Sequence, residues 1–173
     1  MFVAGASGAI GTLVVQMASR RGVRVIGSAS AANHDYLLSL GAEAAVDYHD
    51  DDWPAQIREW STGGVDAALA IQPGIDVGAQ EVVRNSGRVV TVSGYGESAV
   101  TQRGIRVEQV EQVEHRGDGA GADMSQLVDD ITSGLVRLVL ERIYPFEEAI
   151  SAPEKTETRH ARGKLVVTDP TPA

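Results

Sequence analysis

Gly5-Ala6-Ser7-Gly8-Ala9-Ile10-Gly11 joins a short apolar run, Met1 to Gly5, to a stretch of small and apolar residues, Ala9 to Arg21. The run is typical of a buried strand, and the stretch after it is typical of a helix that packs on that strand. A glycine suited to end the helix follows at Gly22. The segment is therefore predicted to be a tight turn from strand to helix, with unpaired backbone amides at the start of the helix.

Three positions in this turn have different physical roles. Ala6 is small enough for the bend, Gly8 lets the backbone approach a pyrophosphate, and Gly11 lets the helix pack closely on the strand. The free amides and the positive end of the helix attract phosphate groups. The pattern is A-x-G-x-x-G rather than three glycines, so it depends on the strand and helix around it, against a purely structural role for small residues. We interpret the whole turn as a pyrophosphate site: Gly5, Ala6, Ser7, Gly8, Ala9, Ile10 and Gly11.

The first 92 residues alternate between apolar, β-rich runs and helical stretches. This alternation is typical of consecutive βαβ units and a parallel sheet. We predict an α/β fold, a doubly wound parallel sheet of the Rossmann type with strand order 3-2-1-4-5-6. The predicted strands lie at residues 1–5, 23–29, 44–48, 65–71 and 88–92, and the predicted helices at 9–21, 33–40, just after 50–52, and 75–84.

The remainder of the chain is predicted less regularly. Residues 105–113 alternate weakly and indicate an edge strand, the glycine-rich residues 117–122 indicate a loop, and 124–133 indicate a helix. An apolar run at 135–143 precedes a charged tail of helical character, 145–164, and a last strand at 163–167. We divide the chain into a nucleotide-binding domain, 1–143, and a C-terminal helix and strand, 144–173.

Composition excludes several classes of function. The 173 residues carry a formal charge of −9, with 24 acidic against 15 basic residues, which argues against nucleic-acid or anionic-membrane binding. The chain has no cysteine, and its four histidines, His34, His49, His115 and His160, lack metal-ligand spacing, so we predict no metal site. We expect one domain, no membrane span, a cytoplasmic location and a small-molecule substrate.

The end of the second predicted strand indicates which dinucleotide is bound. A site for NAD places a carboxylate there, about 20 residues past the turn, to hold the ribose 2′-hydroxyl. Here the first acid is Asp35, already inside the next helix. Ser28, Ser30 and Asn33 offer hydrogen bonds instead, and Tyr48 can pack beside the adenosine. We therefore predict NADP(H), although no Arg or Lys stands close by in the sequence.

Several segments in the same order resemble the medium-chain dehydrogenase/reductase superfamily, and within it the quinone oxidoreductase and enoyl reductase branch. They span nearly the whole chain: the turn at residues 5–11, Ser28-Ala29-Ser30, Ser39-Leu40-Gly41-Ala42, Val46-Asp47-Tyr48, Ser86-Gly87-Arg88-Val89-Val90, Tyr144-Pro145-Phe146-Glu147-Glu148-Ala149 and Gly163-Lys164-Leu165-Val166-Val167. The resemblance implies an NADPH-dependent reductase that transfers hydride to a quinone or to an activated C=C or C=O group.

The resemblance also implies how the site is divided. The turn around Gly8 would bind the pyrophosphate, while Ser30, Asn33 and Tyr48 would contact the 2′-phosphate end; a lysine that many relatives carry near Asn33 is absent here. The loops at Ile71-Gln72 and Ser93-Gly94 would face the nicotinamide.

Relatives in this superfamily begin with a GroES-like catalytic domain, and this chain begins at the first strand of the cofactor domain. We therefore expect the helix and strand at 144–173 to rejoin a domain that is absent here, and their apolar faces to be exposed or repacked. No catalytic residue is assigned; Tyr95 is interpreted as an ordinary loop aromatic. The resemblance further implies a homodimer formed through the edge strand at 105–113.

Three other classes of protein share features with this sequence. A short-chain dehydrogenase needs a lysine four residues after a tyrosine, but that position holds Leu40, Asp52, Ala99 or Glu148 after the four tyrosines, which excludes this class. A non-catalytic nucleotide-binding module or partner subunit remains open. A methyltransferase, which also has a glycine-rich first turn, would bind adenosylmethionine in place of NADPH.

Overall fold

A six-stranded parallel sheet forms the body of the computed structural model, which describes all residues except 72–74, 93–101, 111–117, 159–160 and 170–173. Its strand order is β3-β2-β1-β4-β5-β6, so the predicted doubly wound order is confirmed. Every neighbouring pair is parallel. The strands are β1 (Phe2–Ala4), β2 (Ile26–Ser28), β3 (Ala44–Val46), β4 (Val65–Ala70), β5 (Val83–Thr91) and β6 (Arg106–Gln109).

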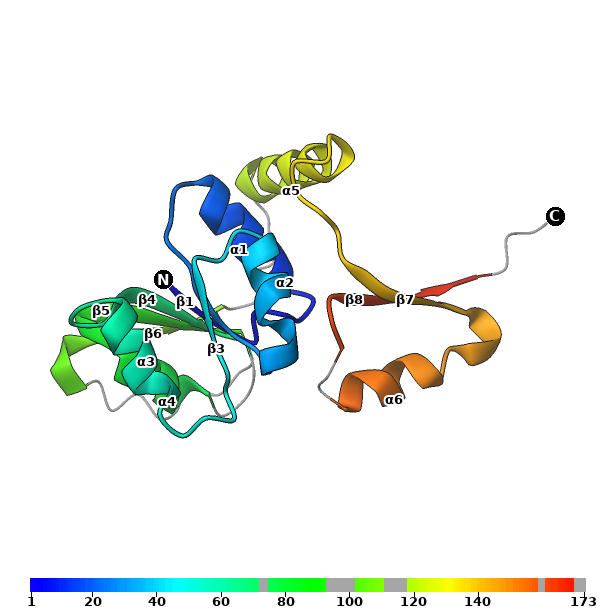
Figure 1. The fold of residues 1–173 in the computed structure, drawn as a ribbon. Coiled ribbons are helices and arrows are strands. Elements are labelled where there is room, and N and C mark those ends of the chain that lie inside the picture. Colours follow the sequence, from blue (N-terminus) through cyan, green and yellow to red (C-terminus); the bar gives the residue numbers. More distant parts are fainter. Residues whose placement is uncertain (72–74, 93–101, 111–117, 159–160, 170–173) are drawn as a thin grey trace.

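Helices cover both faces of this sheet (Figure 1). They are α1 (Gly11–Arg20), α2 (His34–Ser39) after a 3-10 turn η1 (Ala31–Asn33), α3 (Trp53–Trp60) and α4 (Asp76–Val82). Successive side chains of β1 point to opposite faces, and each face has its own buried cluster. Phe2 packs with residues of α3 and α4, whereas Val3 packs with residues of α1 and α2. Burial on both sides explains why β1 is a continuous apolar run rather than an alternating one.

The order of strands reverses beside β1, which lies between β2 and β4. In open parallel sheets, this reversal opens a crevice outside the carboxyl ends of the strands, because the two flanking crossovers run to opposite faces. The glycine-rich turn follows β1 directly and therefore lies at that crevice.

The C-terminal part forms a separate, smaller unit. After α5 (Asp118–Thr132) come β7 (Leu140–Pro145), a 3-10 turn η4 (Phe146–Glu148), α6 (Ser151–Glu157) and β8 (Lys164–Thr168). Among the described strands, β7 and β8 pair only with each other, in parallel; we call this pair, with the residues between and directly beside its strands, the C-terminal ribbon. Figure 1 shows the ribbon and α6 standing out from the body. The ribbon begins at Leu140, so its first strand crosses the predicted division at residue 143/144.

Hydrogen bonds at Gly163 and in the linker before β7 help to attach the ribbon to the body. Gly163 forms a parallel bridge with Gly8, and its amide donates to the Ser7 carbonyl at 3.0 Å. In the linker before β7, the Arg137 amide donates to Gln16 Oε1 at 2.7 Å, and Gln16 Nε2 donates to the Arg137 carbonyl at 3.0 Å. Gln16 is buried on α1, and its two hydrogen bonds with the backbone of Arg137 hold the linker against this helix.

Two sequence predictions about elements are corrected. The predicted loop at 117–122 is wrong, because α5 already begins at Asp118. In this segment glycines alternate with alanine, which is the best helix former. The amphipathic sequence that follows stabilises the helix, so the helix extends back over these residues. β5 begins five residues before the predicted Arg88, since Val83 pairs with Val65 ahead of a bulge. For the edge strand, β6 confirms 106–109, while 111–113 lie outside the described residues.

Candidate functional site

The turn after β1 is fixed by hydrogen bonds to the end of β2. The amide of Gly5 donates to Ser28 Oγ at 3.2 Å, and the amide of Ala6 donates to the Ser28 carbonyl at 3.0 Å. Gly5 has a φ of +74°, in the left-handed region that favours glycine. The turn closes when the Gly8 amide donates to the Gly5 carbonyl at 3.2 Å. The residue whose backbone conformation allows the bend is thus Gly5, and not Ala6, to which the sequence analysis assigned this role.

The start of α1 offers free hydrogen-bond donors. No side chain caps this helix at Ile10. The amides of Ile10 and Gly11 also have no backbone acceptor within the described part of the chain. Uncapped amides at the positive end of a helix are suited to bind an anion.

Gly8 and Gly11 leave room for different neighbours. A Cβ built on Gly11 would lie 2.4 Å from the Gly5 carbonyl oxygen and 2.6 Å from Ala6 Cα, so this glycine is needed for the turn itself. A Cβ built on Gly8 would meet only the Gly5 carbonyl oxygen, at 3.4 Å, which is an ordinary contact. The fold therefore tolerates a side chain at Gly8, and the space that it would enter is the cavity beside the turn. This geometry fits a diphosphate at the backbone of Gly8.

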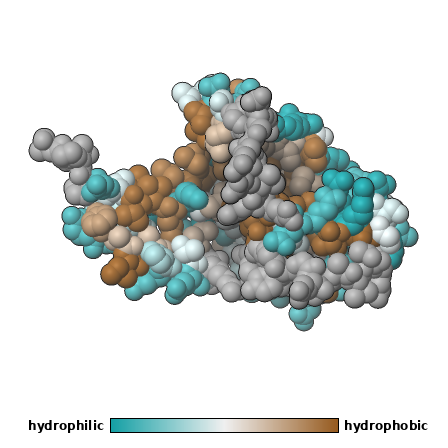
Figure 2. Space-filling model, turned by 180° about the vertical axis from the view of Figure 1, so that it is seen from behind, coloured by the Kyte–Doolittle hydropathy of each residue, from teal (hydrophilic) through white to brown (hydrophobic). Residues whose placement is uncertain are grey.

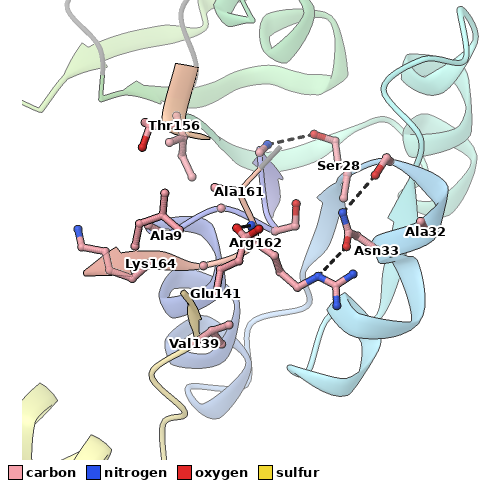
Figure 3. A pocket seen from close by; sticks show the side chains of 18 of the residues that line it. Ala9, Ser28, Ala32, Asn33, Val139, Glu141, Thr156, Ala161, Arg162 and Lys164 are labelled. Carbon is pink, nitrogen blue, oxygen red and sulfur yellow. Dashed lines mark hydrogen bonds between the residues drawn. The ribbon is translucent and has the colours of Figure 1, made fainter. Parts of the chain in front are cut away.

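A cavity of about 980 Å³ lies between the turn, the end of β2 and the C-terminal ribbon (Figure 3). Of the residues predicted from sequence, those that line it are Gly5, Ser7, Gly8, Ala9, Ser28, Ser30, Asn33, Tyr48 and Ile71. Ala6, Ile10 and Gly11 do not line it: Ala6 is buried in the core behind the turn, and Ile10 is exposed. Gln72, Ser93, Gly94 and Tyr95 lie outside the described residues.

The end of the cavity beside β2 is polar and carries no carboxylate of its own strand. Ser30 Oγ accepts a hydrogen bond from Asn33 Nδ2 at 3.1 Å, and the Tyr48 side chain is exposed. Asp35 is not one of the described residues that line the cavity. Among the described residues, neither β2 nor the loop after it therefore places an acid where it would hold a free ribose 2′-hydroxyl.

Asp47 fixes the loop that carries Ser30 and Asn33. Its carboxylate accepts hydrogen bonds from the amides of Ala31 and His49, at 2.8 and 2.9 Å, and lies 2.7 Å from His49 Nδ1. The hydrogen bond from the His49 amide, joined by the other two, lowers the pKa of Asp47 from 3.8 to about 2.

This depressed pKa predicts an acid-sensitive loop. Because the unfolded carboxyl group takes up its proton first, the stabilisation by Asp47 is complete above the unfolded pKa of 3.8 and is lost as the pH falls through about 2. We expect the difference in free energy of unfolding between the native chain and Asp47→Asn to shrink steadily across that window. Chemical denaturation at a series of pH values measures it. A difference that stays constant down to the lower limit would contradict this assignment.

Sequence reasoning missed the wall of the cavity that comes from the C-terminal ribbon. That wall includes Val139, Leu140, Glu141, Thr156, Ala161, Arg162, Gly163, Lys164 and Leu165. Gly163 has a φ of +76°, and a Cβ there would lie 2.5 Å from the Val139 carbonyl oxygen, so the close approach of the ribbon needs a glycine. The motif Gly163-Lys164 was noted as a family resemblance, but no local pattern in the sequence places it over the turn.

Comparison with known proteins shows the family of this chain. Residues 40–167 match the family model described as zinc-binding dehydrogenase. The chain belongs to this family. The predicted resemblance to the medium-chain dehydrogenase/reductase superfamily is thereby confirmed. The family assignment gives no support to the methyltransferase alternative.

Individual relatives of this zinc-binding dehydrogenase family member have low sequence identity to it, but they match nearly its whole length. The "Probable zinc-binding oxidoreductase, mitochondrial" of Arthroderma benhamiae is 29% identical over 95% of this chain and 50% of its own length. The "NAD(P)H oxidoreductase RTN4IP1, mitochondrial" of Danio rerio is 28% identical over 96% of this chain and 48% of its own. The quinone oxidoreductase structure from Coxiella burnetii has a TM-score of 0.84 at 27% identity, covering 96% of this chain and 51% of that one. The chain thus spans about half the length of these relatives.

Zinc does not fit the residues that the structure describes. No group of three or more His, Cys, Asp or Glu side chains among them could hold a metal ion, and the whole sequence has no cysteine. Within the same described residues, no helix is both long and apolar enough to cross a bilayer. The cytoplasmic location stays a prediction, since two relatives are named as mitochondrial.

Proposed function

We propose that this chain binds NADP(H) and forms the cofactor-binding part of an oxidoreductase that transfers hydride to a quinone or to an activated C=C or C=O group. The observation that carries the proposal is the cavity beside the uncapped start of α1, where Gly8 leaves space against the backbone. The names of relatives, which include a quinone oxidoreductase and trans-enoyl reductases, support this substrate class.

The polar end of the cavity supports NADP(H) over NAD(H). A 2′-phosphate is repelled by a nearby free carboxylate, and β2 ends on Ser28 with none. Two carboxylates that the structure describes near this end, those of Asp47 and Glu141, are held by protein groups. Asp47 accepts from two amides, and Glu141 accepts from the Arg162 amide at 2.6 Å and pairs with Lys155 at 3.2 Å.

The residues of this chain would bind and orient the cofactor rather than react. The nicotinamide ring supplies the hydride chemistry when it is bound. The backbone at Gly8 and Ala9, which line the cavity, would hold the diphosphate together with the uncapped amides of Ile10 and Gly11 next to them. Ser30 and Asn33 would meet the adenosine end. Ile71 and Ile75 line the cavity and provide an apolar surface that keeps water away from a flat ring.

Two measurements test the proposal in sequence. Titration of the chain with NADPH and with NADH, followed by calorimetry, should give saturable binding with preference for NADPH. Turnover of a quinone and of an enone with NADPH then tests the reaction. Preference for NADH would remove the NADP(H) assignment, and an absence of any nicotinamide binding would remove the function.

A second candidate is a nucleotide-binding module that needs another domain or chain for catalysis. It is favoured by the ribbon unit, where exposed fractions reach 53% at Ile143, 61% at Phe146 and 78% at Ile150. Figure 2 shows hydrophobic surface on the part that stands out from the body. An apolar surface of this kind is typical of a face that packs against a partner. Tight NADPH binding without turnover supports this candidate, and turnover by the 173-residue chain alone rejects it.

The free edge of β6 supports a proposal of homodimer formation. β6 pairs only with β5 among the described strands, so its other edge presents unpaired backbone groups. A second copy could pair with this edge across a twofold axis and continue the sheet. Light scattering during size-exclusion chromatography tests the proposal, and a monomer at high protein concentration would reject it.

A further inference from the structure

Arg162 comes to the adenosine end of the cavity from the far end of the chain. It precedes β8, yet its Nε donates to Asn33 Oδ1 at 2.9 Å, across 129 positions of sequence. Figure 3 shows this side chain reaching toward Asn33, whose own side chain donates to Ser30 Oγ. The cation that is missing from the sequence around Asn33 is thus supplied by the C-terminal ribbon.

The position of Arg162 is fixed by contacts of its backbone and of its planar guanidinium group. Its amide donates to Glu141 Oε2 at 2.6 Å, and the next residue, Gly163, is bridged to the turn at Gly8. The guanidinium carbon lies 4.9 Å from the centre of the Tyr36 ring, at a distance suited to a cation–π contact. A guanidinium held in this way has a defined orientation before any ligand arrives.

Most donors of this guanidinium remain available. An arginine side chain has five N–H donors, and Asn33 uses only the one at Nε. Within the part of the chain that the structure describes, the two terminal nitrogens of Arg162 have no recorded acceptor. Two parallel N–H groups match a phosphate in a way that a lysine ammonium does not.

The other cations nearby are placed for different contacts. Lys164 lines the cavity beside Ala9, near the turn, in Figure 3. Arg137 lies 6.0 Å from the Tyr36 ring, donates to Ser39 Oγ at 3.3 Å and does not line the cavity. Arg162 is therefore the cation among the described residues that is held against Asn33.

We propose that Arg162 is the specificity-determining residue for the 2′-phosphate of NADP(H), acting together with Ser30 and Asn33. This inference rests on the proposed function. It also makes the C-terminal ribbon part of the cofactor site, since the ribbon carries the selecting charge. NADPH should therefore fix the ribbon to the body more firmly than NADH does.

Binding of two small probes to the 173-residue chain tests this role without any turnover. Adenosine 2′,5′-bisphosphate contains the 2′-phosphate, and 5′-AMP lacks it. We expect Arg162→Gln to weaken the bisphosphate roughly 10- to 100-fold, as loss of charge-assisted hydrogen bonds implies, and 5′-AMP less than about twofold. Arg162→Lys keeps the charge but loses the two parallel N–H groups, so its affinity for the bisphosphate should lie between those of the native chain and Arg162→Gln.

Arg20→Gln is the matched control, because it removes one positive charge from the exposed far end of α1. It should leave the affinity for both probes unchanged. Equal effects of Arg162→Gln on the two probes, or no effect on either, would overturn the role of Arg162. If Arg162→Gln keeps the native preference for NADPH over NADH, only this inference fails. If the native chain binds neither nicotinamide cofactor, the proposed function fails with it.

Discussion

Gly8→Val strongly weakens cofactor binding and leaves the chain folded. The added side chain enters the cavity, since the nearest protein atom to a Cβ is the Gly5 carbonyl oxygen at an ordinary 3.4 Å. A diphosphate is then kept away from the uncapped amides of α1. Hydrogen bonds to a charged group contribute about 1.5–3 kcal/mol each, so loss of two weakens binding by roughly 100-fold or more.

A graded pair of variants separates binding from folding. Gly8→Ala adds one carbon and should weaken NADPH and NADH to the same smaller extent, because both cofactors carry the diphosphate. Both variants should melt within a few degrees of the native chain, measured by circular dichroism. Undiminished binding of NADPH by Gly8→Val would show that the diphosphate lies elsewhere.

Gly11→Ala destabilises the fold itself. Its Cβ would lie 2.4 Å from the Gly5 carbonyl oxygen and 2.6 Å from both Ala6 Cα and the Ala6 carbonyl oxygen, and none of these is the end of a flexible side chain. The turn and the start of α1 must then move apart, against a core that includes Val15. Such overpacking costs about 3 kcal/mol, which lowers the melting temperature of a chain of this size by roughly 6–12 °C.

Gly63→Ala is the control for Gly11→Ala. Gly63 has a φ of +85° with no atom within 4 Å of a built Cβ, so alanine there meets only the left-handed backbone cost of about 1–2 kcal/mol. Urea denaturation of the two variants compares the costs directly. A Gly11→Ala variant no less stable than Gly63→Ala would contradict the close packing of α1 on the turn.

The body of the fold follows from local features of the sequence. β1 is buried on both faces, which makes it a continuous apolar run, and Gly22 and Gly41 have the positive φ that ends α1 and α2. These signals act over a few residues, and the chain order of strands and helices then limits a doubly wound sheet to few topologies. The turn, its position at the crevice and the missing carboxylate at the end of β2 could all be predicted this way.

The ribbon wall of the cavity could not be predicted because its contacts are distant in sequence. Arg162 and Asn33 are 129 positions apart, and neither residue has a neighbour pattern that points to the other. The contact depends on Gly163, whose positive φ lets the ribbon approach Val139 and bridge to Gly8. Sequence reasoning therefore found one wall of the site and concluded that no cation was at hand.

The backbone amides of the turn provide the most direct test of the account. In amide NMR spectra of the ¹⁵N-labelled chain, titration with NADPH should shift the resonances of Gly8, Ile10 and Gly11 most strongly. 5′-AMP, which lacks the diphosphate, should shift them far less. If NADPH saturates the chain while these three amides stay in place, the turn does not bind the diphosphate and the central claim is wrong.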